Sequence, residues 1–253
     1  MGVIVSNEET NREARNQVFA NQAGQPGQPQ VQRGMPSRNV MKDDFGFEIP
    51  VENVPLPSRG VSYPADSPLY GQETIQIRAM TAREEDILTS RALIKKGTVI
   101  SHLLRSCMID KRIDPDEMLS GDRNAVMVAL RVTGYGADYN VEVDCPACGE
   151  RSKQSFNLGE LAINRLQIQP VAVGANVFEM KLPVTKKVVR FKFLTGRDEQ
   201  DIMVQNERRK KQGMQADNLV TMRLQYAIQA VAGIDDKTKI GMFIKNMPAR
   251  DSL

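Results

Sequence analysis

A tight Cys-Pro-x-Cys-Gly turn constrains this chain more than any other feature. It lies in the stretch YNVEVDCPACGERSKQSF, Tyr139 to Phe156, between two segments that alternate as β-strands do. In a zinc knuckle, the proline and glycine of such a turn let backbone N–H groups point at the thiolate sulfurs, which lowers the thiolate pKa and fixes two metal ligands. We therefore expect a β-hairpin with a zinc-knuckle-like turn from Cys145 to Cys148.

A tetrahedral structural zinc ion needs four ligands, and the chain has only one other cysteine and one histidine. Cys107 is the candidate third ligand. His102 is a poor fourth, because it lies five residues before Cys107, about 140° around a helix. The fourth ligand would come from Asp110, Asp144 or a cysteine of another chain. The metal prediction is thus a structural zinc ion held by Cys107, Cys145 and Cys148.

Other interpretations of these cysteines stay open. Cys107 falls on an apolar helix stripe, and buried cysteine is common in protein cores. Cys145 and Cys148 would alternatively form a tight turn kept after the loss of a metal. A redox pair is disfavoured because no βαβ pattern surrounds the motif. No general base converges on the cysteines, so a metal here is expected to be structural and not catalytic.

Length and composition indicate an ordinary globular chain. Its 253 residues suffice for one large domain or two modest ones, with 41% hydrophobic and 26% charged residues. Three cysteines make no disulfide framework and favour a reduced, cytosolic chain. No apolar run approaches the roughly 18 residues of a membrane span, and the N-terminus has no signal-peptide pattern. A net charge of +3 is too mild to imply a partner.

Residues 1–50 are predicted to form a flexible N-terminal arm. The stretch from Asn21 to Arg38 is rich in Gln, Gly and Pro and has little apolar surface to bury. Composition does not separate a disordered terminus from an arm that orders against a neighbouring subunit. The remainder divides into a first α+β unit with the CxxC hairpin, residues 51–165, and a second, shortened α+β unit, residues 166–253.

Strand and helix signals open the first unit. Four prolines between Phe47 and Pro64 predict an extended loop. The alternating residues Glu73 to Met80 predict a half-buried strand. Thr81 and Glu84 form a capping box for a helix that should reach about Lys96 and stop at Gly97.

Two more helices are predicted before the hairpin. The segment Thr98 to Met108 carries an apolar stripe that includes Leu103, Leu104 and Cys107. A third helix is expected to use Asp122 as its cap and to end at the "GYG" sequence. The hairpin with the CxxC turn follows directly.

An internal repeat is the most informative organisational feature. Residues 75–97, IQIRAMTAREEDILTSRALIKKG, align with residues 189–213, VRFKFLTGRDEQDIMVQNERRKKQG, with a two-residue insertion in the second copy. Both read as a strand, a Thr-x-Arg-acid-acid cap, a helix and a glycine stop. The pattern predicts repeated strand–helix–helix units, the second one incomplete. Two unrelated capped helices are the alternative, since such caps recur often.

A basic stretch runs from Lys181 to Lys211. It holds ten Lys or Arg against four acids, so nucleic acid is a conceivable partner. Phe191 and Phe193, however, share a strand face with Val189 and are expected in the core, where they cannot stack on bases. Cations at a helix C-terminus are favoured by the helix dipole in any case. A solvated basic face is therefore preferred, and nucleic acid is not the expected partner.

Catalytic motifs are missing from the sequence. It contains no P-loop, GxGxxG, GxSxG or HExxH pattern. His102 stands between apolar residues and is expected to pack near a helix surface. Acid pairs such as Glu84/Glu85 and Asp235/Asp236 are explained by caps and turns. We therefore expect a protein that is not an enzyme and has no small-molecule substrate.

Five motifs occur in a fixed order between Pro55 and Leu161: L-P-S-x-G, T-x-R-E-E-D, L-x-G-D-R, L-R-x-x-x-Y-G and C-P-x-C-G. In this order they resemble the baseplate-protein family of contractile-tailed bacteriophages, the T-even-type baseplate hub or hub-assembly proteins. The resemblance implies a non-enzymatic component of the virion tail baseplate, made in the cytoplasm of the infected host. The long Gln/Gly/Pro tail departs from the family pattern.

The resemblance implies other baseplate or tail proteins as partners, with self-association as an option and no membrane. The leading functional prediction is a structural subunit of a phage tail baseplate. One alternative is an assembly chaperone that is absent from the mature particle. Another is a zinc-ribbon protein that binds nucleic acid through residues 181–211 and would show strongly salt-dependent binding. The expected fold class is α+β in all three cases.

Overall fold

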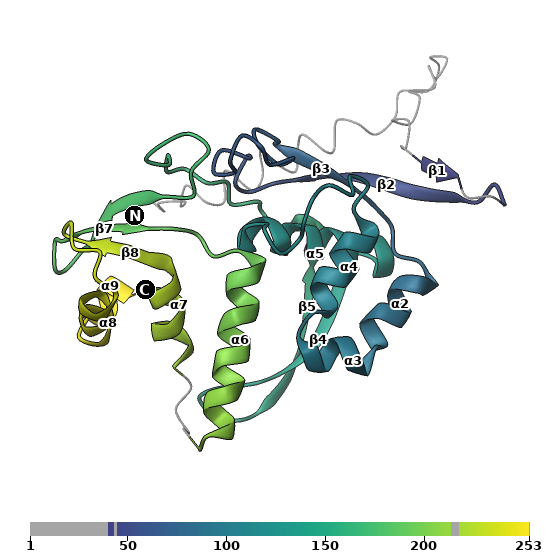
Figure 1. Ribbon diagram of the computed structural model, residues 1–253. Coiled ribbons are helices and arrows are strands. Elements are labelled where there is room, and N and C mark those ends of the chain that lie inside the picture. Colours follow the sequence, from purple (N-terminus) through teal and green to yellow (C-terminus); the bar gives the residue numbers. More distant parts are fainter. Residues whose placement is uncertain (1–39, 43–44, 214–217, 253) are drawn as a thin grey trace, which may run out of the picture. The chain divides into compact units, whose positions relative to one another are not determined.

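The computed structural model describes residues 40–42, 45–213 and 218–252. Most of the predicted N-terminal arm, residues 1–50, lies outside these ranges, so its state stays a prediction. The described part combines helices with three small antiparallel sheets, which confirms the α+β class (Figure 1). None of the described helices is both long enough and apolar enough to span a membrane.

The first half of the described chain contains two antiparallel sheets and four α-helices. The strand order of the first sheet is β1-β2-β3, and β4 pairs with β5 as a separate hairpin. In chain order the elements are β1 (Val40–Lys42), β2 (Glu48–Pro55), β3 (Thr74–Arg78), α2 (Ala82–Thr89), α3 (Arg91–Lys96), α4 (Val99–Cys107), α5 (Ser120–Tyr135), β4 (Asp138–Asp144), β5 (Arg151–Asn157) and the short 3₁₀ helix η1 (Leu158–Glu160).

The second half contains one antiparallel sheet and four further helices. Its strand order is β6-β7-β8, so consecutive strands are neighbours. The elements are β6 (Phe178–Lys181), β7 (Val188–Phe191), α6 (Gly196–Lys211), α7 (Leu219–Ala227), β8 (Ile228–Val231), α8 (Lys237–Lys245) and α9 (Ala249–Ser252).

The proline-rich stretch forms strand β2 where the sequence predicted a loop. β2 holds Pro50 and Pro55, and it lies between β1 and β3. β1 pairs only with residues 48–50, and β3 pairs only with residues 51–55. Each proline therefore has a strand on one side alone, where its missing N–H is tolerated as in an edge strand.

Strand β3 and the helix cap after it match the prediction. Ile75 and Ile77 are buried on one face of β3. The carboxylate of Glu84 accepts the backbone N–H of Thr81 at 2.9 Å, as a capping box requires. Arg78 donates two hydrogen bonds to the same carboxylate, at 2.7 and 3.0 Å, so the cap is tied to the preceding strand.

The predicted helix up to Lys96 is broken in two. α2 ends at Thr89, and Ser90 has an extended backbone with ψ 105° before α3 begins. The hydroxyl of Thr89 donates to the carbonyl oxygen of Glu85 at 2.9 Å. Back-bonding of this kind slightly destabilises and bends a helix, and here it occurs in the last turn before the break. Gly97 ends α3 with φ 71°, as predicted.

Helix α4 follows the prediction closely, whereas α5 begins earlier than predicted. Leu104 and Cys107 of α4 are buried. Leu119 is the N-cap of α5, and Asp122 is the third residue of that helix. The prediction that Asp122 is the cap is therefore wrong. Its buried carboxylate bonds to a distant loop, as described below.

The buried apolar side chains form two clusters that three phenylalanines connect. One cluster draws mainly on β2, β3, α4 and α5, and the other on β7, β8 and α8. Phe193 packs against the first cluster and Phe191 against the second. The ring of Phe178, which is fully buried, lies 4.8 Å from that of Phe193 and 5.8 Å from that of Phe191, between centroids.

Replacing Glu84 with Gln should destabilise the protein in a pH-dependent way. Burial pushes the pKa of Glu84 up, but hydrogen bonds from Arg78, Ser106 and Thr81 hold it well below its ordinary value of 4.5. The stabilisation from this carboxylate is thus complete above that value and is lost as the pH falls through and below it. At neutral pH we expect a loss of about 3 kcal/mol, since Arg78 keeps a charge without its partner.

The measurement is urea unfolding of both proteins between about pH 7 and about pH 3. The difference in unfolding free energy should shrink toward the acid end. Asp86→Asn, at an exposed carboxylate of the same helix, is the control and should change stability little. A Glu84→Gln difference that stays constant across this range would contradict the assignment.

Candidate functional site

The CxxC turn lies at the tip of the β4–β5 hairpin, as the sequence predicted. The two strands are paired in register from Asp138 with Asn157 to Asp144 with Arg151. The N–H of Cys145 donates to the carbonyl oxygen of Glu150 at 2.9 Å, and the N–H of Gly149 donates back to that of Cys145 at 2.7 Å. Gly149 has φ 73°, a conformation that favours glycine.

The turn brings its two thiols together at the surface. Cys145 is half-buried and Cys148 is exposed. Backbone N–H groups of Cys148 and Ala147, and then the thiol of Cys148, hydrogen-bond to the sulfur of Cys145 and lower its pKa. This arrangement of N–H groups around a sulfur is the one that prepares a cysteine to bind metal as a thiolate.

Cys107 lies elsewhere, in the first core cluster. Its side chain has 0% exposure and stands on α4 beside the ion pair of Arg78 and Glu84. Burial, and then the charge of Glu84, raises the pKa of the Cys107 thiol to about 11. A buried, protonated thiol is a poor metal ligand.

The three predicted ligands therefore do not share one site in this structure. Across the described residues, no group of three or more His, Cys, Asp and Glu side chains is placed to hold a metal ion. Cys145 and Cys148 come together, and Cys107 stays apart. Zinc binding by Cys107, Cys145 and Cys148 remains a prediction.

The other predicted ligands are engaged or remote. His102 is an exposed residue of α4. Asp110 accepts hydrogen bonds from the guanidinium of Arg112 at 2.8 and 3.0 Å. Asp144, next to the CxxC turn, accepts one from Arg151 at 3.0 Å.

The hairpin that carries the CxxC turn is exposed along both strands. Cross-strand ion pairs, such as Arg151 with Asp144, lie on one face. The other face carries the cross-strand pair Tyr139 and Phe156, together with Val143, and these side chains are 40–50% exposed. An isolated two-stranded hairpin is only marginally stable in water, so its rigidity depends on what joins its ends or covers its apolar face.

Sequence reasoning missed a buried carboxylate, Asp122, that fixes the Leu-Pro-Ser loop after β2. One oxygen of Asp122 accepts the backbone N–H of Ser58 at 2.9 Å. The other accepts the hydroxyls of Ser58 and Tyr63, at 2.6 and 2.7 Å. The Tyr63 hydroxyl in turn accepts the N–H of Leu119, the α5 cap, at 2.9 Å. The sequence did contain a signal for this contact, namely the motifs L-P-S-x-G and L-x-G-D-R. The serine of the first and the aspartate of the second meet here.

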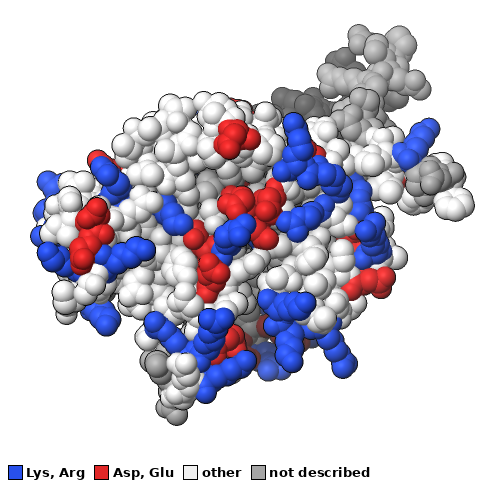
Figure 2. Space-filling view, in the orientation of Figure 1, with Lys and Arg blue, Asp and Glu red and all other residues white. Residues whose placement is uncertain are grey.

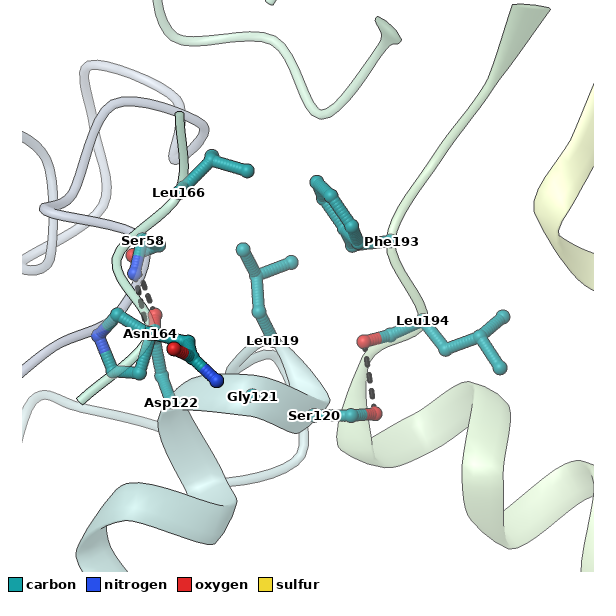
Figure 3. Close-up of a pocket in the computed structure, with 10 residues that line it drawn as sticks. Ser58, Leu119, Ser120, Gly121, Asp122, Asn164, Leu166, Phe193 and Leu194 are labelled. Carbon is teal, nitrogen blue, oxygen red and sulfur yellow. Dashed lines mark hydrogen bonds between the residues drawn. The ribbon is translucent and has the colours of Figure 1, made fainter. Parts of the chain in front are cut away.

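A mostly apolar pocket of about 230 Å³ opens beside this carboxylate (Figure 3). Leu119, Leu166 and Phe193 point toward one another across it. The segment after the hairpin forms one wall, because the N–H of Leu166 donates to the carbonyl oxygen of Pro57 at 2.8 Å. Among the described residues that line the pocket, Asp122 is the one titratable side chain.

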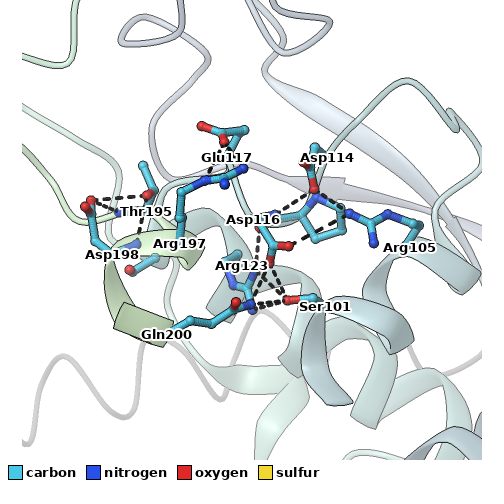
Figure 4. Close-up of polar contacts among 12 residues, drawn as sticks. Ser101, Arg105, Asp114, Asp116, Glu117, Arg123, Thr195, Arg197, Asp198 and Gln200 are labelled. Atoms are coloured by element: carbon cyan, nitrogen blue, oxygen red, sulfur yellow. Dashed lines mark hydrogen bonds and ion pairs between the residues drawn. The ribbon is translucent and has the colours of Figure 1, made fainter. Parts of the chain in front are cut away.

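A polar network joins the first half of the chain to α6 (Figure 4). Asp116 lies at its centre and accepts hydrogen bonds from Ser101 and, at 2.8 Å, from Gln200. The backbones also pair: Ser120 N–H donates to Leu194 at 2.8 Å, and Gly196 N–H donates to Met118 at 2.9 Å. The loop before α5 and the start of α6 are thereby held as one piece.

Gly196 is required by this close approach. A Cβ at Gly196 would lie 2.2 Å from a guanidinium nitrogen of Arg123 and 2.8 Å from the carbonyl oxygen of Pro115. Arg123 itself is almost fully buried and donates to that same carbonyl oxygen. A larger residue would push α6 away from the Asp116 network.

The basic stretch from Lys181 to Lys211 is partly neutralised. Arg190, Lys192 and Arg197 form ion pairs with Glu179, Asp198 and Glu117, respectively. Figure 2 shows Lys and Arg interspersed with Asp and Glu on one face of the molecule. Val189 is buried, and Phe191 and Phe193 pack against the two core clusters as predicted. These two rings are therefore not an exposed platform for stacking bases.

One comparison with known proteins gives a match. Residues 61–172 match a family model described as T4 bacteriophage base plate protein. The match includes α2 to α5 and the CxxC hairpin, and it ends before β6. No curated protein and no solved structure matches the chain. The family match supports a phage baseplate protein, as the order of the five motifs implied.

Replacing Asp122 with Asn should destabilise the protein by about 3 kcal/mol. Three donor groups converge on the two carboxylate oxygens, and an amide would turn its own donor toward them. Tyr63→Phe removes one of these donors and should cost about half as much. Both are measured as shifts in urea-unfolding midpoint. Asp138→Asn, at an exposed carboxylate, is the control. If the unfolding midpoint of the Asp122→Asn variant equals that of the control, the role of Asp122 is refuted.

Proposed function

We propose that this chain is a non-enzymatic structural subunit of a bacteriophage tail baseplate, resident in the virion and acting through protein–protein contacts. The family match over residues 61–172 carries the proposal. It supports a baseplate protein in general. The hub or hub-assembly identity, the contractile tail and a role within the finished particle belong to the proposal.

Apolar side chains exposed after the hairpin support a role in binding neighbours. Residues 161–177 contain neither helix nor strand. We call them the connector. Its exposed apolar residues are Leu161, Ile163, Ile168, Val171 and Val173, the last of them 80% exposed. Long irregular segments in compact proteins are usually functional, and clustered apolar exposure marks interaction surfaces.

The connector is nonetheless fixed to the fold at several points. Leu166 bonds to Pro57 as described, and the guanidinium of Arg59 donates to the carbonyl oxygen of Leu166 at 3.2 Å. The N–H of Gly174 donates to the carbonyl oxygen of Val61 at 3.1 Å. The backbone is thus held in place while the apolar side chains face outward. A pre-ordered segment of this kind binds with a smaller entropic penalty than a free one.

Matching contacts in the two halves support the predicted repeat, which we include in the proposal. Arg78 precedes the Thr81–Glu84 cap and pairs with Glu84, and Lys192 precedes the Thr195–Asp198 cap and pairs with Asp198 at 2.8 Å. Both caps are capping boxes. In each half a nine-residue helix follows, α4 or α7. The residue after α4, Met108, pairs with Ile77 of β3, and the strand after α7, β8, pairs with β7.

A buried aspartate recurs at the matching place as well. Asp251 is the third residue of α9, as Asp122 is of α5. Its two oxygens accept the backbone N–H groups of Val184 and Thr185, at 2.7 and 2.9 Å. These residues follow a Leu-Pro pair after β6, just as Ser58 follows Leu56-Pro57 after β2. Two copies of one unit are the simplest account of this agreement.

Quantitative mass spectrometry of purified particles tests the proposed function. We expect a fixed, stoichiometric number of copies in finished particles, because a structural subunit stays where it is assembled. Presence in assembly intermediates with absence from finished particles would overturn the proposal and make the chain an assembly chaperone. A nucleic-acid-binding role would instead show as binding to DNA that falls steeply with salt.

Charged substitutions in the connector test its role separately. Val171→Asp with Val173→Asp should reduce incorporation into particles at least tenfold, since a carboxylate buried at an apolar contact is strongly unfavourable. Gln167→Asp with Gln169→Asp, at polar positions of the same segment, is the matched control. Circular dichroism should show an unchanged fold in both variants. Normal incorporation of the valine double variant would exclude the connector as a docking segment.

A further inference from the structure

The knuckle supplies two thiolates where a closed zinc site needs four ligands. Cys145 and Cys148 share one turn, with two backbone N–H groups directed at the Cys145 sulfur. Both side chains are at the tip of the hairpin, where a second group of ligands has access. The exposure of Cys148 leaves the pair accessible to ligands from another chain.

The chain has no second pair of soft ligands to complete that sphere. Its sequence contains one further cysteine and one histidine. Cys107 is fully buried among Ile77, Leu104 and Met108 of the first core cluster. Bringing it to the tip would open that core. His102 is on the same helix, and in the part of the chain that the structure describes no third ligand stands beside the pair.

We propose that Cys145 and Cys148 form half of a tetrahedral zinc site, and that the same two cysteines of a second copy of this chain form the other half. Two identical turns related by a twofold axis supply four sulfur ligands to one metal ion. This inference goes beyond the proposed function and does not depend on it.

A second copy fits better than an unrelated partner for two reasons. Each copy already presents the required pair at an exposed tip, so no other protein has to supply cysteines. One face of the hairpin carries exposed apolar side chains, with Val143 near the tip and Tyr139 and Phe156 toward the base. A second hairpin drawn in by the shared metal would cover part of this face. Metal and apolar contact would then stabilise a hairpin that is marginal alone.

The zinc ion replaces the two thiol protons of each copy, so four protons leave as four Zn–S bonds form. Zinc does not change oxidation state, and no oxidant or reductant is required. Because binding competes with protons, the pair of chains should form more readily at pH 8 than at about pH 5.

The test is metal content and molar mass of the full chain, purified under reducing conditions with zinc present. We expect one zinc ion for every two chains and a dimer by light scattering. Chelation should return the protein to monomer. The double variant Cys145→Ser, Cys148→Ser should bind no zinc and stay monomeric, with an unchanged circular dichroism spectrum.

A second cysteine variant separates this site from one that uses Cys107. Cys107→Ala should retain zinc and the dimer, because Cys107 is not a ligand in the proposed site. If that variant does not fold, Co²⁺ substitution of the natural chain replaces it. The cobalt spectrum should show tetrahedral coordination by four thiolates.

Three results would overturn the proposal. They are no bound zinc, one zinc ion per monomeric chain, and loss of zinc in a folded Cys107→Ala variant. The first would leave the turn as a purely structural feature, and the other two would favour a site within one chain. None of these outcomes bears on whether the chain is in finished particles, so the proposed function is tested independently.

Discussion

The fold of the first half depends on the carboxylate of Asp122. This group is fully buried, and three hydrogen bonds from Ser58 and Tyr63 satisfy it. Through them the loop after β2 is fastened to the first turn of α5, some sixty residues later in the chain. Tyr63 extends the link to the N–H of Leu119. The Leu119 backbone forms an isolated bridge with Thr195, so one buried charge organises both the first core and the approach of α6.

The helix caps act on the same principle at shorter range. Glu84 and Asp198 each accept hydrogen bonds at the N-terminus of a helix and bind a cation, Arg78 at the end of β3 and Lys192 directly after β7. Each carboxylate therefore connects a strand to a helix. It also supplies hydrogen bonds to the N–H groups and the cation, which lose water when they are buried. The two caps also differ: Ala82 opens α2, whereas α6 opens with Gly196, where Arg123 and Pro115 leave no space for a Cβ. Gly196 thus allows α6 to approach Arg123 and Pro115 closely.

Sequence reasoning succeeded where structure is determined locally. Both capping boxes, the stop at Gly97 and the hairpin with its CxxC turn depend on residues within a few positions of one another. It failed where a distant partner decides. Asp122 has the chemistry of an N-cap, but Ser58 and Tyr63 occupy its oxygens, and Leu119 takes the cap position. Pro50 and Pro55 fit within β2 only because β1 and β3 pair with different parts of it. Cys107 is buried in the first core cluster, apart from the other two cysteines, and the zinc site predicted for the three of them stays a prediction.

The buried carboxylates and the CxxC turn differ in how many of their polar groups have partners. Asp122, Glu84 and Asp251 find their partners within the described residues, and they lie in well-packed surroundings. The CxxC turn has its backbone hydrogen bonds in place and carries two cysteines, Cys145 and Cys148, on a hairpin exposed along both strands. Ordering such a turn without a ligand costs conformational entropy that two short strands barely offset. For the zinc-bridged pair of chains that we propose, such a turn suits a joint between subunits, because the metal and the second copy together would stabilise the hairpin.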